Sequence, residues 1–406
     1  MALTVDLTIP HANACGVTVA EDADPATVSF AADPHGGPEC LWFCFRLTPR
    51  GRPSASQVRL VLQHATNMLG GGEPQHMRPV VRHAGTDWER LGAPTVQALP
   101  DGRSEVAWTV RLPATWMDVA YCYPYGPAEL KSLLRDCKGY WRADAIGVSQ
   151  RGRPLIRLSN GWGDRQAGGA AERRPGVYAI ARQHSGETPG SWVLDGFLRR
   201  MAELGSAAPL VWAVPLAHTD GVEKGDYGKD GFPHDLNRAW GRPPMRHEVL
   251  VYQADVARWV AACRPALALD LHAPGACETE GVYCYVPEAK RAFEQHRTLK
   301  GWVTAMQRAL RPEFAARPFG RVADYASRWE TPTFTAHCWA EHGVPALSIE
   351  TPYAVIGSRV LTREDYRGIG ARLAAPVAER LPGTRPKVPR RGASKAEGDP
   401  DNGGRA

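Results

Sequence analysis

Two apolar runs of this sequence end in residues that could together bind one metal ion. Residues 176–181 lead into His184 and Glu187, a histidine and a carboxylate three positions apart at a tight turn. That short offset lets both side chains face one ion with little chain entropy to lose. A second run, over 266–271, ends at His272 and would deliver a third ligand from a separate strand. Two histidines and one glutamate with an open fourth position are typical of a catalytic zinc site.

A third apolar run, over 344–349, ends at Glu350, a carboxylate suited to proton transfer. Each of these signals has a structural alternative when it is taken singly. A His-x-x-Glu spacing arises by chance, a histidine at a strand end can be a hydrogen-bonded structural residue, and a glutamate there can cap a helix or face solvent. Their occurrence together favours a catalytic site.

The chain around these residues has the rhythm of an α/β domain. From about Tyr123, strand-like apolar runs alternate with helical stretches, and Pro127 suits the first turn of a helix. Strands that alternate with helices at this pitch predict a substantially parallel sheet. In such sheets ligands bind at the carboxyl ends of the strands, which is where the three candidate runs end.

The first 120 residues read differently. Short apolar or alternating runs, bounded by Gly, Pro, Asn or Asp, predict an antiparallel β-sandwich, and no group of titratable residues there forms a site. We therefore expect three parts: a β-sandwich domain over 1–122, an α/β domain over 123–384, and a disordered basic tail over 385–406.

Further motifs lie between the first two strand ends, at 219–222 (TDGV) and 235–240 (DLNRAW). In this order, with the HxxE pair, the strand ending at His272 and the final glutamate, they resemble the M14 family of zinc metallocarboxypeptidases. The β-rich front end and the segment 121–125 (YCYPY) resemble the cytosolic carboxypeptidase branch. The resemblance implies an N-terminal antiparallel β-sandwich followed by a zinc carboxypeptidase α/β domain, whose mixed, largely parallel sheet is flanked by helices.

The resemblance implies a role for each matching residue of the metal site. His184, Glu187 and His272 would hold zinc, one ion per chain. Glu350 would act as the general base toward the attacking water and then as the acid toward the leaving amine.

The DLNRAW motif would supply three further roles by the same resemblance. Arg238 would stabilise the oxyanion of the tetrahedral intermediate, and Asn237 would hydrogen-bond the terminal carboxylate of the substrate. Asp235 would accept a hydrogen bond from the nitrogen of His184 that does not bind metal, and would so fix the ring. Taken alone, this motif also fits a polar turn with a surface salt bridge.

The sequence departs from the family pattern near the expected substrate site. Cytosolic carboxypeptidases usually carry an arginine in the stretch before DLNR, and Gly228 stands at that position here. Lys229 is the neighbouring cation and the candidate for substrate binding in its place, although lysine lacks the bidentate fork of arginine. The substrate tyrosine of the family has no clear counterpart among residues 328–331. The hydrolytic residues are kept and the substrate is left open.

The function predicted is that of a zinc metallocarboxypeptidase, which hydrolyses the amide bond of a C-terminal or side-chain-linked amino acid in a peptide or acyl-amino-acid substrate. The alternative, which the missing arginine favours, is a zinc amidase or deacylase acting on a small acyl-amino compound or a peptidoglycan-type fragment. A non-catalytic binding module on the same fold would be indicated by loss of a ligand or of the base, and all four residues are present.

Charge and composition argue against several other classes, and a solvated tail is favoured over a nucleic-acid role for residues 385–406. The 49 basic and 43 acidic side chains give a net charge of +6, and the tail over 385–406 carries half of the excess. No basic stripe with interleaved aromatic residues and no Cys/His finger supports nucleic-acid binding. No run approaches the roughly 20 apolar residues of a membrane span, and no secretory leader is visible. We therefore expect a cytoplasmic protein without a membrane partner.

The nine cysteines are scattered without a repeated spacing, so reduced thiols are expected. Cys277 and Cys284 lie shortly after His272 and could form a local bridge or a second metal site. Buried structural cysteines are the favoured interpretation.

Overall fold

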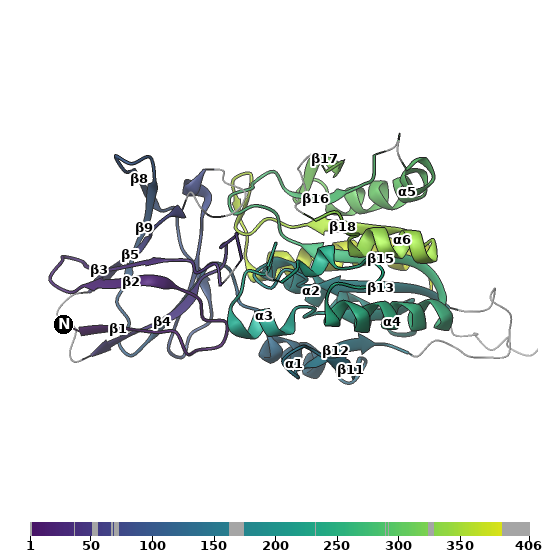
Figure 1. The fold of residues 1–406 in the computed structure, drawn as a ribbon, viewed down its shortest axis with the longest axis horizontal. Coiled ribbons are helices and arrows are strands. Elements are labelled where there is room, and N and C mark those ends of the chain that lie inside the picture. Colours follow the sequence, from purple (N-terminus) through teal and green to yellow (C-terminus); the bar gives the residue numbers. More distant parts are fainter. Residues whose placement is uncertain are drawn as a thin grey trace, which may run out of the picture.

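A computed structural model describes residues 2–35, 37–50, 56–65, 68, 73–161, 174–231, 233–288, 290, 292–323 and 329–383 of the chain. The tail predicted over 385–406 lies outside these residues. Figure 1 shows a sandwich of strands lying end-on against a larger body of helices and strands, with the N-terminus at the far end of the sandwich.

The N-terminal part contains two five-stranded sheets, in the orders β1-β4-β10-β6-β7 and β2-β3-β5-β9-β8. Their elements are β1 (Ala2–Asp6), β2 (Cys15–Ala20), β3 (Ala26–Ala31), β4 (Cys44–Arg50), β5 (Gln57–Leu62), the 3₁₀ turn η2 (Pro74–His76), β6 (Val80–His83), β7 (Glu89–Arg90), β8 (Thr95–Ala98), β9 (Ser104–Arg111) and β10 (Met117–Ala120).

The predicted sandwich is therefore present, with one difference in strand direction. β3 and β5 pair in parallel, whereas the other strand pairs of both sheets are antiparallel. Between these two strands the chain crosses to the facing sheet as β4, and this crossover returns it in the original direction.

The second part is built on an eight-stranded mixed sheet in the order β11-β12-β14-β13-β15-β18-β16-β17. Its four central strands, β14, β13, β15 and β18, are parallel, as the sequence predicts. The pairings β11–β12, β12–β14 and β16–β18 are antiparallel, and β16 pairs in parallel with β17. The strands are β11 (Arg142–Val148), β12 (Pro154–Ser159), β13 (Pro175–Ala181), β14 (Leu210–Val214), β15 (Arg264–His272), β16 (Val282–Tyr285), β17 (Ala315–Arg321) and β18 (Ala346–Glu350), with a separate hairpin of β19 (Val355–Ile356) and β20 (Arg359–Val360).

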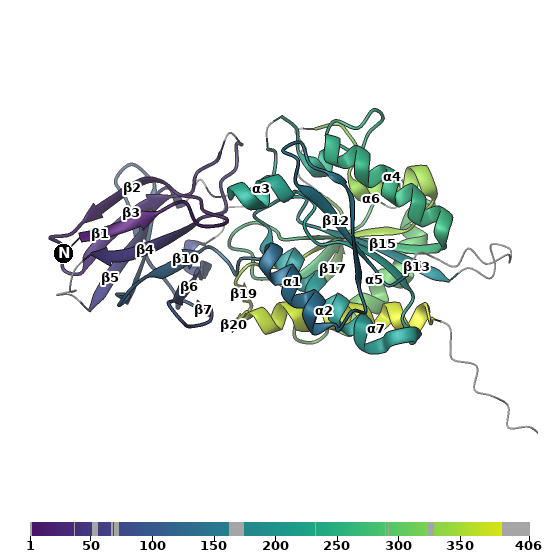
Figure 2. The ribbon, with the colours of Figure 1, turned by 90° about the horizontal axis from the view of Figure 1, so that it is seen from below.

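Helices cover both faces of this sheet. Figure 2 shows α4 and α6 on one side and α1, α2 and α7 on the other. The helices are α1 (Pro127–Asp136), α2 (Thr188–Leu204), α3 (Thr219–Lys224), α4 (His247–Ala262), α5 (Phe293–Leu310), α6 (Phe334–His342) and α7 (Arg363–Arg380), with 3₁₀ turns η4 (Gly205–Ala207) and η5 (Leu236–Arg238). The helix predicted to begin at Pro127 does so, and β13 is buried along its whole length because both faces of the sheet are covered.

The sandwich and the α/β body share one hydrophobic core. Polar contacts also cross the boundary: Tyr121 donates its hydroxyl to the Ala276 carbonyl at 2.6 Å, and Arg90 Nε donates to the Leu361 carbonyl at 2.7 Å. The two parts are thus packed against each other.

The nine cysteines are free thiols in the structure, as expected. Burial raises the pKa of the Cys277 and Cys284 thiols to about 12, so neither is a ready thiolate ligand in this form. Among the described residues, no helix has both the length and the apolar character needed to cross a bilayer.

Candidate metal centre

Strand pairing brings the three predicted strand ends to one edge of the sheet. β13 lies between β14 and β15 in parallel, and β15 pairs in parallel with β18. In this register His272 stands directly across from Glu350. The carboxyl ends of parallel strands meet at the same edge, so the turn that follows β13 faces both residues.

The turn after β13 is held in an unusual backbone conformation. Arg182 has a φ of +66°, in the left-handed region. Its Nε donates to the Ser185 carbonyl at 2.7 Å, and its Nη1 donates to the Tyr125 carbonyl at 2.9 Å. A Cβ at Gly186 would come within 2.6 Å of the Tyr227 ring, so only glycine fits there. These contacts hold the turn in one conformation and so fix the positions from which the His184 and Glu187 side chains project.

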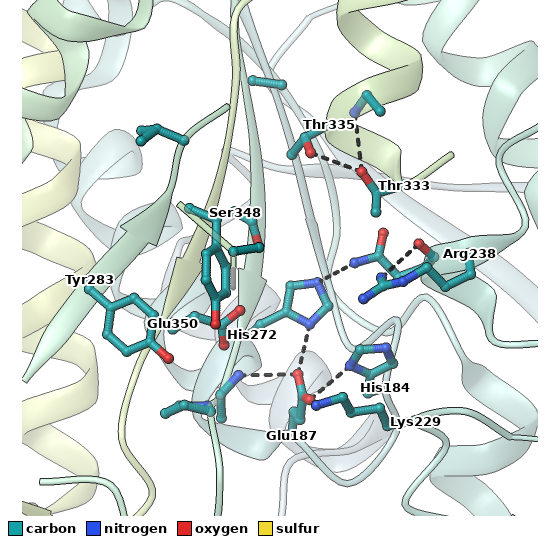
Figure 3. Close-up of a pocket in the computed structure, with 18 of the residues that line it drawn as sticks. His184, Glu187, Lys229, Arg238, His272, Tyr283, Thr333, Thr335, Ser348 and Glu350 are labelled. Atoms are coloured by element: carbon teal, nitrogen blue, oxygen red, sulfur yellow. Dashed lines mark hydrogen bonds and ion pairs between the residues drawn. The ribbon is translucent and has the colours of Figure 1, made fainter. Parts of the chain in front are cut away.

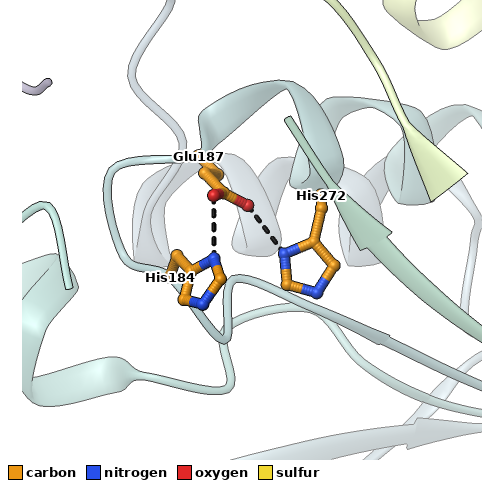
Figure 4. Close-up of side chains that lie close together, drawn as sticks. All are labelled: His184, Glu187 and His272. Carbon is orange, nitrogen blue, oxygen red and sulfur yellow. Dashed lines mark hydrogen bonds and ion pairs between the residues drawn. The ribbon is translucent and has the colours of Figure 1, made fainter. Parts of the chain in front are cut away.

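Glu187 is the meeting point of the predicted ligands (Figure 4). One carboxylate oxygen lies 2.8 Å from Nδ1 of His184, and the other lies 2.7 Å from Nδ1 of His272. The Ala273 amide donates to the second oxygen at 3.1 Å, and the Tyr227 hydroxyl lies 3.4 Å from the first. All three candidate ligands are buried.

Each histidine is backed by a carboxylate at its other ring nitrogen. Asp235 lies 3.2 Å from Nε2 of His184, and Asp270 lies 2.9 Å from Nε2 of His272. Asp270 is itself held by Gln183, whose Nε2 donates to it at 2.8 Å. A ring that gives Nδ1 to a metal keeps its hydrogen on Nε2, and Asp235 is placed to accept that hydrogen from His184. At His272, Asp270 brings a negative charge close to Nε2, and the side-chain nitrogen of Asn237 lies 3.0 Å from the same atom.

The same carboxylates set the charge of the two rings in the metal-free protein. Burial opposes a charge on His184, but Glu187 and Asp235 outweigh it and raise the pKa of the ring to about 9. The pKa of His272 also lies well above its ordinary value, since Asp270 and Glu187 overcome the effect of burial. Burial likewise opposes ionisation of Glu187, yet the two rings hold the pKa of its carboxyl below its ordinary value.

This donor set fits a divalent metal ion. Within the part of the chain that the structure describes, His184, Glu187 and His272 form the one group of at least three such side chains whose ligand atoms lie within 4.8 Å of one another. Two imidazole Nδ1 atoms and a carboxylate converge, and a carboxylate lies near the other ring nitrogen of each histidine. Such N and O donors match the preferences of zinc.

Glu350 lies with these residues in a cavity of about 400 Å³. Burial raises the pKa of its carboxyl to about 7, against the opposing influence of His272 and Lys229. A carboxyl with a pKa near neutrality can both accept and return a proton. The geometry therefore suits a proton shuttle beside the candidate metal ligands.

The predicted substrate-binding residues line the same cavity (Figure 3). Lys229 is one of the residues that line this cavity, and in Figure 3 its side chain points toward Glu187. Its neighbour Gly228 has a φ of +86°, and a Cβ there would lie 2.6 Å from Ser185 Oγ. A larger residue at 228 therefore does not fit this conformation.

Arg238 and Asn237 reach the cavity from η5. Arg238 is 9% exposed, and its Nη1 donates to the backbone carbonyl of Asn237 at 3.1 Å. The side-chain nitrogen Nδ2 of Asn237 lies 3.0 Å from Nε2 of His272, and its side-chain oxygen Oδ1 accepts a hydrogen bond from the backbone amide of Phe334 at 3.1 Å. Asn237 thus has contacts within the protein, and its contact with a substrate carboxylate stays a prediction.

Several residues of the site were not predicted. Asp270 could have been predicted from the sequence. Residues two apart on a strand lie on the same face of the sheet, so Asp270 must lie on the face of His272. No feature of the sequence predicts the contacts of the Tyr227 hydroxyl or of the Arg182 guanidinium. Further cavity-lining residues, which come from loops and from β16, β18 and α6, include Glu278, Tyr283, Tyr285, Thr333, Thr335 and Ser348.

Sequence comparison connects the chain to the cytosolic carboxypeptidases. It is 26% identical over 186 residues to chicken (Gallus gallus) cytosolic carboxypeptidase 1, covering 41% of this chain and 15% of that protein. It is 32% identical over 142 residues to human cytosolic carboxypeptidase 6, covering 32% of this chain and 28% of that protein. The chain thus spans less than a third of the length of these relatives. No protein-family model matches it.

Structural comparison covers nearly the whole chain. A metallo-carboxypeptidase from Burkholderia cenocepacia superimposes with a TM-score of 0.73 and 18% identity, over 94% of this chain and 99% of that one. The fold is therefore that of the metallo-carboxypeptidases, including the N-terminal sandwich. The resemblance that the motifs predict is confirmed by both comparisons.

Proposed function

We propose that this chain, which has the fold and the sequence relatives of metallo-carboxypeptidases, is a zinc-dependent carboxypeptidase that hydrolyses the amide bond of a C-terminal or side-chain-linked amino acid. The observation that carries the proposal is the convergence of His184, Glu187 and His272 beside Glu350 in one cavity. A lone structural histidine would not explain two Nδ1 atoms directed at one carboxylate, with a further carboxylate near the other nitrogen of each ring.

His184, Glu187 and His272 would hold the zinc ion, one per chain. When bound, zinc supplies Lewis-acid activation of water and of the scissile carbonyl. Asp235 would keep the hydrogen on Nε2 of His184 and hold that ring in place, and Asp270 would place a negative charge beside His272.

Glu350 would carry the proton. As a carboxylate it accepts a proton from the attacking water, and as a carboxylic acid it gives that proton to the nitrogen of the leaving amine. Its pKa of about 7 in the metal-free protein places it where both transfers are feasible near neutral pH.

Arg238 and Lys229 would supply positive charge on the substrate side of the cavity. Arg238 faces the oxyanion that develops on the scissile carbonyl, and Lys229 faces a substrate carboxylate together with Asn237. A preorganised cation is most effective in a buried site, where the dielectric constant is low.

A mass-spectrometric turnover screen of zinc-loaded protein tests the proposal. Its substrates are a peptide set with free and amidated C-termini, together with acyl-amino acids, and protein stripped with a chelator is the control. We expect single residues to be lost from the free-acid peptides only. Cleavage of acyl-amino acids with all peptides untouched would instead identify the amidase that the absence of an arginine at 228 favours. Zinc-loaded protein that cleaves neither set would contradict both.

A further inference from the structure

The segment over 225–230, which carries Lys229 into the cavity, contacts the N-terminal sandwich as well as the rest of the α/β body. It follows directly after α3 and begins at Gly225, whose φ is +77°. A Cβ at this glycine would lie 2.2 Å from the carbonyl oxygen of Ala12, so the two backbones are in close contact. The sandwich is therefore in direct contact with the segment that carries Lys229.

Asn13 makes the first polar link. Its side-chain nitrogen donates to the Gly225 carbonyl at 2.8 Å and to the Asp33 carbonyl at 2.9 Å, while its oxygen accepts from the Asp33 amide at 2.8 Å. Asn13 is 2% exposed, so these bonds are shielded from water. The asparagine ties the loop that follows β3 to the start of the segment.

His35 makes the second link. Its Nδ1 lies 2.7 Å from a carboxylate oxygen of Asp226, and Lys224 approaches the same oxygen at 3.4 Å. The His35 and Asp226 side chains are only 19% and 22% exposed. The sandwich thus contacts two consecutive residues of the segment through side chains.

The rest of the segment contacts the metal centre. Ser185 Oγ donates to the Asp226 carbonyl at 2.7 Å, and the Gly186 amide donates to the Tyr227 carbonyl at 2.8 Å. At the far end, the Asp230 amide donates to the carboxylate of Asp235 at 3.0 Å. One short stretch therefore runs from the sandwich, past the turn that carries the candidate ligands, to the carboxylate behind His184.

We infer that Asn13 and His35 of the sandwich are positioning residues that fix the place of Lys229 in the cavity, so that the sandwich forms part of the substrate-binding apparatus. The inference rests on the proposed function for its effect on turnover, but not for its effect on the segment itself. Lys229 lies three residues beyond the sandwich contacts and has a long, flexible side chain. Loosening the start of the segment lets the ammonium group leave its place while the metal ligands stay.

Steady-state kinetics on the zinc-loaded full chain test this. We expect Asn13→Ala to raise KM for a free-acid peptide about fivefold and to change kcat little, since a net hydrogen bond corresponds to about a two- to tenfold effect. His35→Gly, which suits the positive φ of 47° at this position, should act in the same direction. His35→Asn keeps an amide donor near the place of Nδ1 and should restore the wild-type KM.

A double-mutant cycle separates positioning from general stability. Lys229→Met removes the charge and keeps the length of the side chain. In that background Asn13→Ala should have no further effect on KM, because the residue it positions no longer binds substrate. Arg59→Ala breaks an ion pair with Glu105 inside the sandwich and serves as the matched control, with unchanged KM. An equal rise in KM from Asn13→Ala in both backgrounds would overturn the inference, as would a loss of zinc in Asn13→Ala.

Hydrogen exchange keeps the inference testable if the chain hydrolyses no peptide. Amides over 225–231 should exchange faster in Asn13→Ala and His35→Gly than in wild type, and at the wild-type rate in Arg59→Ala. Unchanged protection of this stretch in both variants would overturn the positioning role independently of any activity.

Discussion

The cavity has a metal end, formed by the candidate ligands and Glu350, and a substrate end around Lys229. The two ends are built in different ways. The candidate ligands and Glu350 follow from β13, β15 and β18, whose parallel register places their ends together. Lys229 stands on an irregular segment, and Tyr283 and Thr333 come from the outer strand β16 and the N-terminus of α6. Strand ends keep a metal site in place, whereas loops can change without loss of the fold. The departure at Gly228 falls at the loop-built end.

The largest expected effect comes from removing a ligand at the metal end. His272→Ala leaves two ligands and removes the ring that contacts one oxygen of Glu187, so the metal should be lost on dialysis. Turnover should fall by more than about 10⁴-fold, because activation of water and stabilisation of charge fail together. Metal analysis and kcat/KM on the same preparation check this. Full metal occupancy in the variant would mean that His272 is not a ligand.

Removing the base should leave the metal in place. Glu350→Gln keeps the shape of the side chain but cannot accept a proton, so we expect a fall in kcat of about 10³-fold with unchanged metal content. Glu341→Gln, which alters a carboxylate whose ion pair is with Arg242 outside the cavity, is the matched control. Substantial activity in Glu350→Gln would assign the base to another group.

The metal end also predicts a strong pH dependence of metal uptake. In the metal-free protein the pKa of His184 is about 9 and that of His272 is raised as well, so both rings are charged at neutral pH. Metal must displace these protons, and its apparent affinity should therefore increase with pH, by about tenfold per unit for each proton released. Competition with a chelator between about pH 6 and pH 8 measures the slope. An affinity that is independent of pH would show that the rings are already neutral.

Most of the metal end could be predicted from the sequence, because the position of each of its residues depends on few contacts. A histidine or glutamate that closes a buried parallel strand has one edge on which to lie, and residues 184, 187, 272 and 350 lie there. The parallel pairing of β3 with β5 was not predictable, since it depends on how strands distant in the chain meet across two sheets. The same holds for the Tyr227 hydroxyl, whose contact with Glu187 requires a particular path of the 225–230 segment.

A smaller effect is expected at Asp270, which lies beside the candidate ligand His272 and does not itself bind the metal. In Asp270→Asn, the amide oxygen can still accept from Gln183, but the amide nitrogen then faces the hydrogen on Nε2 of His272. We expect metal affinity to fall by about 10- to 100-fold, as at other carboxylates that orient ligating histidines. Asp118→Asn is the control, because Asp118 is also a buried acid, 1% exposed, but pairs with Arg46 and Arg82 in the sandwich. It should lower the melting temperature without changing metal affinity.

The smallest effect is expected at the substrate end. Lys229→Met should raise KM for a free-acid peptide about tenfold, the loss of one charge-assisted contact, with metal content and most of kcat retained. The ratio of KM for the free-acid peptide to that for its amide should approach one if Lys229 recognises the carboxylate. A fall in kcat at constant KM would place its charge on the oxyanion, where Arg238 is proposed to act. A loss of metal would mean that Lys229 supports Glu187, and the two ends of the cavity would then not be separable.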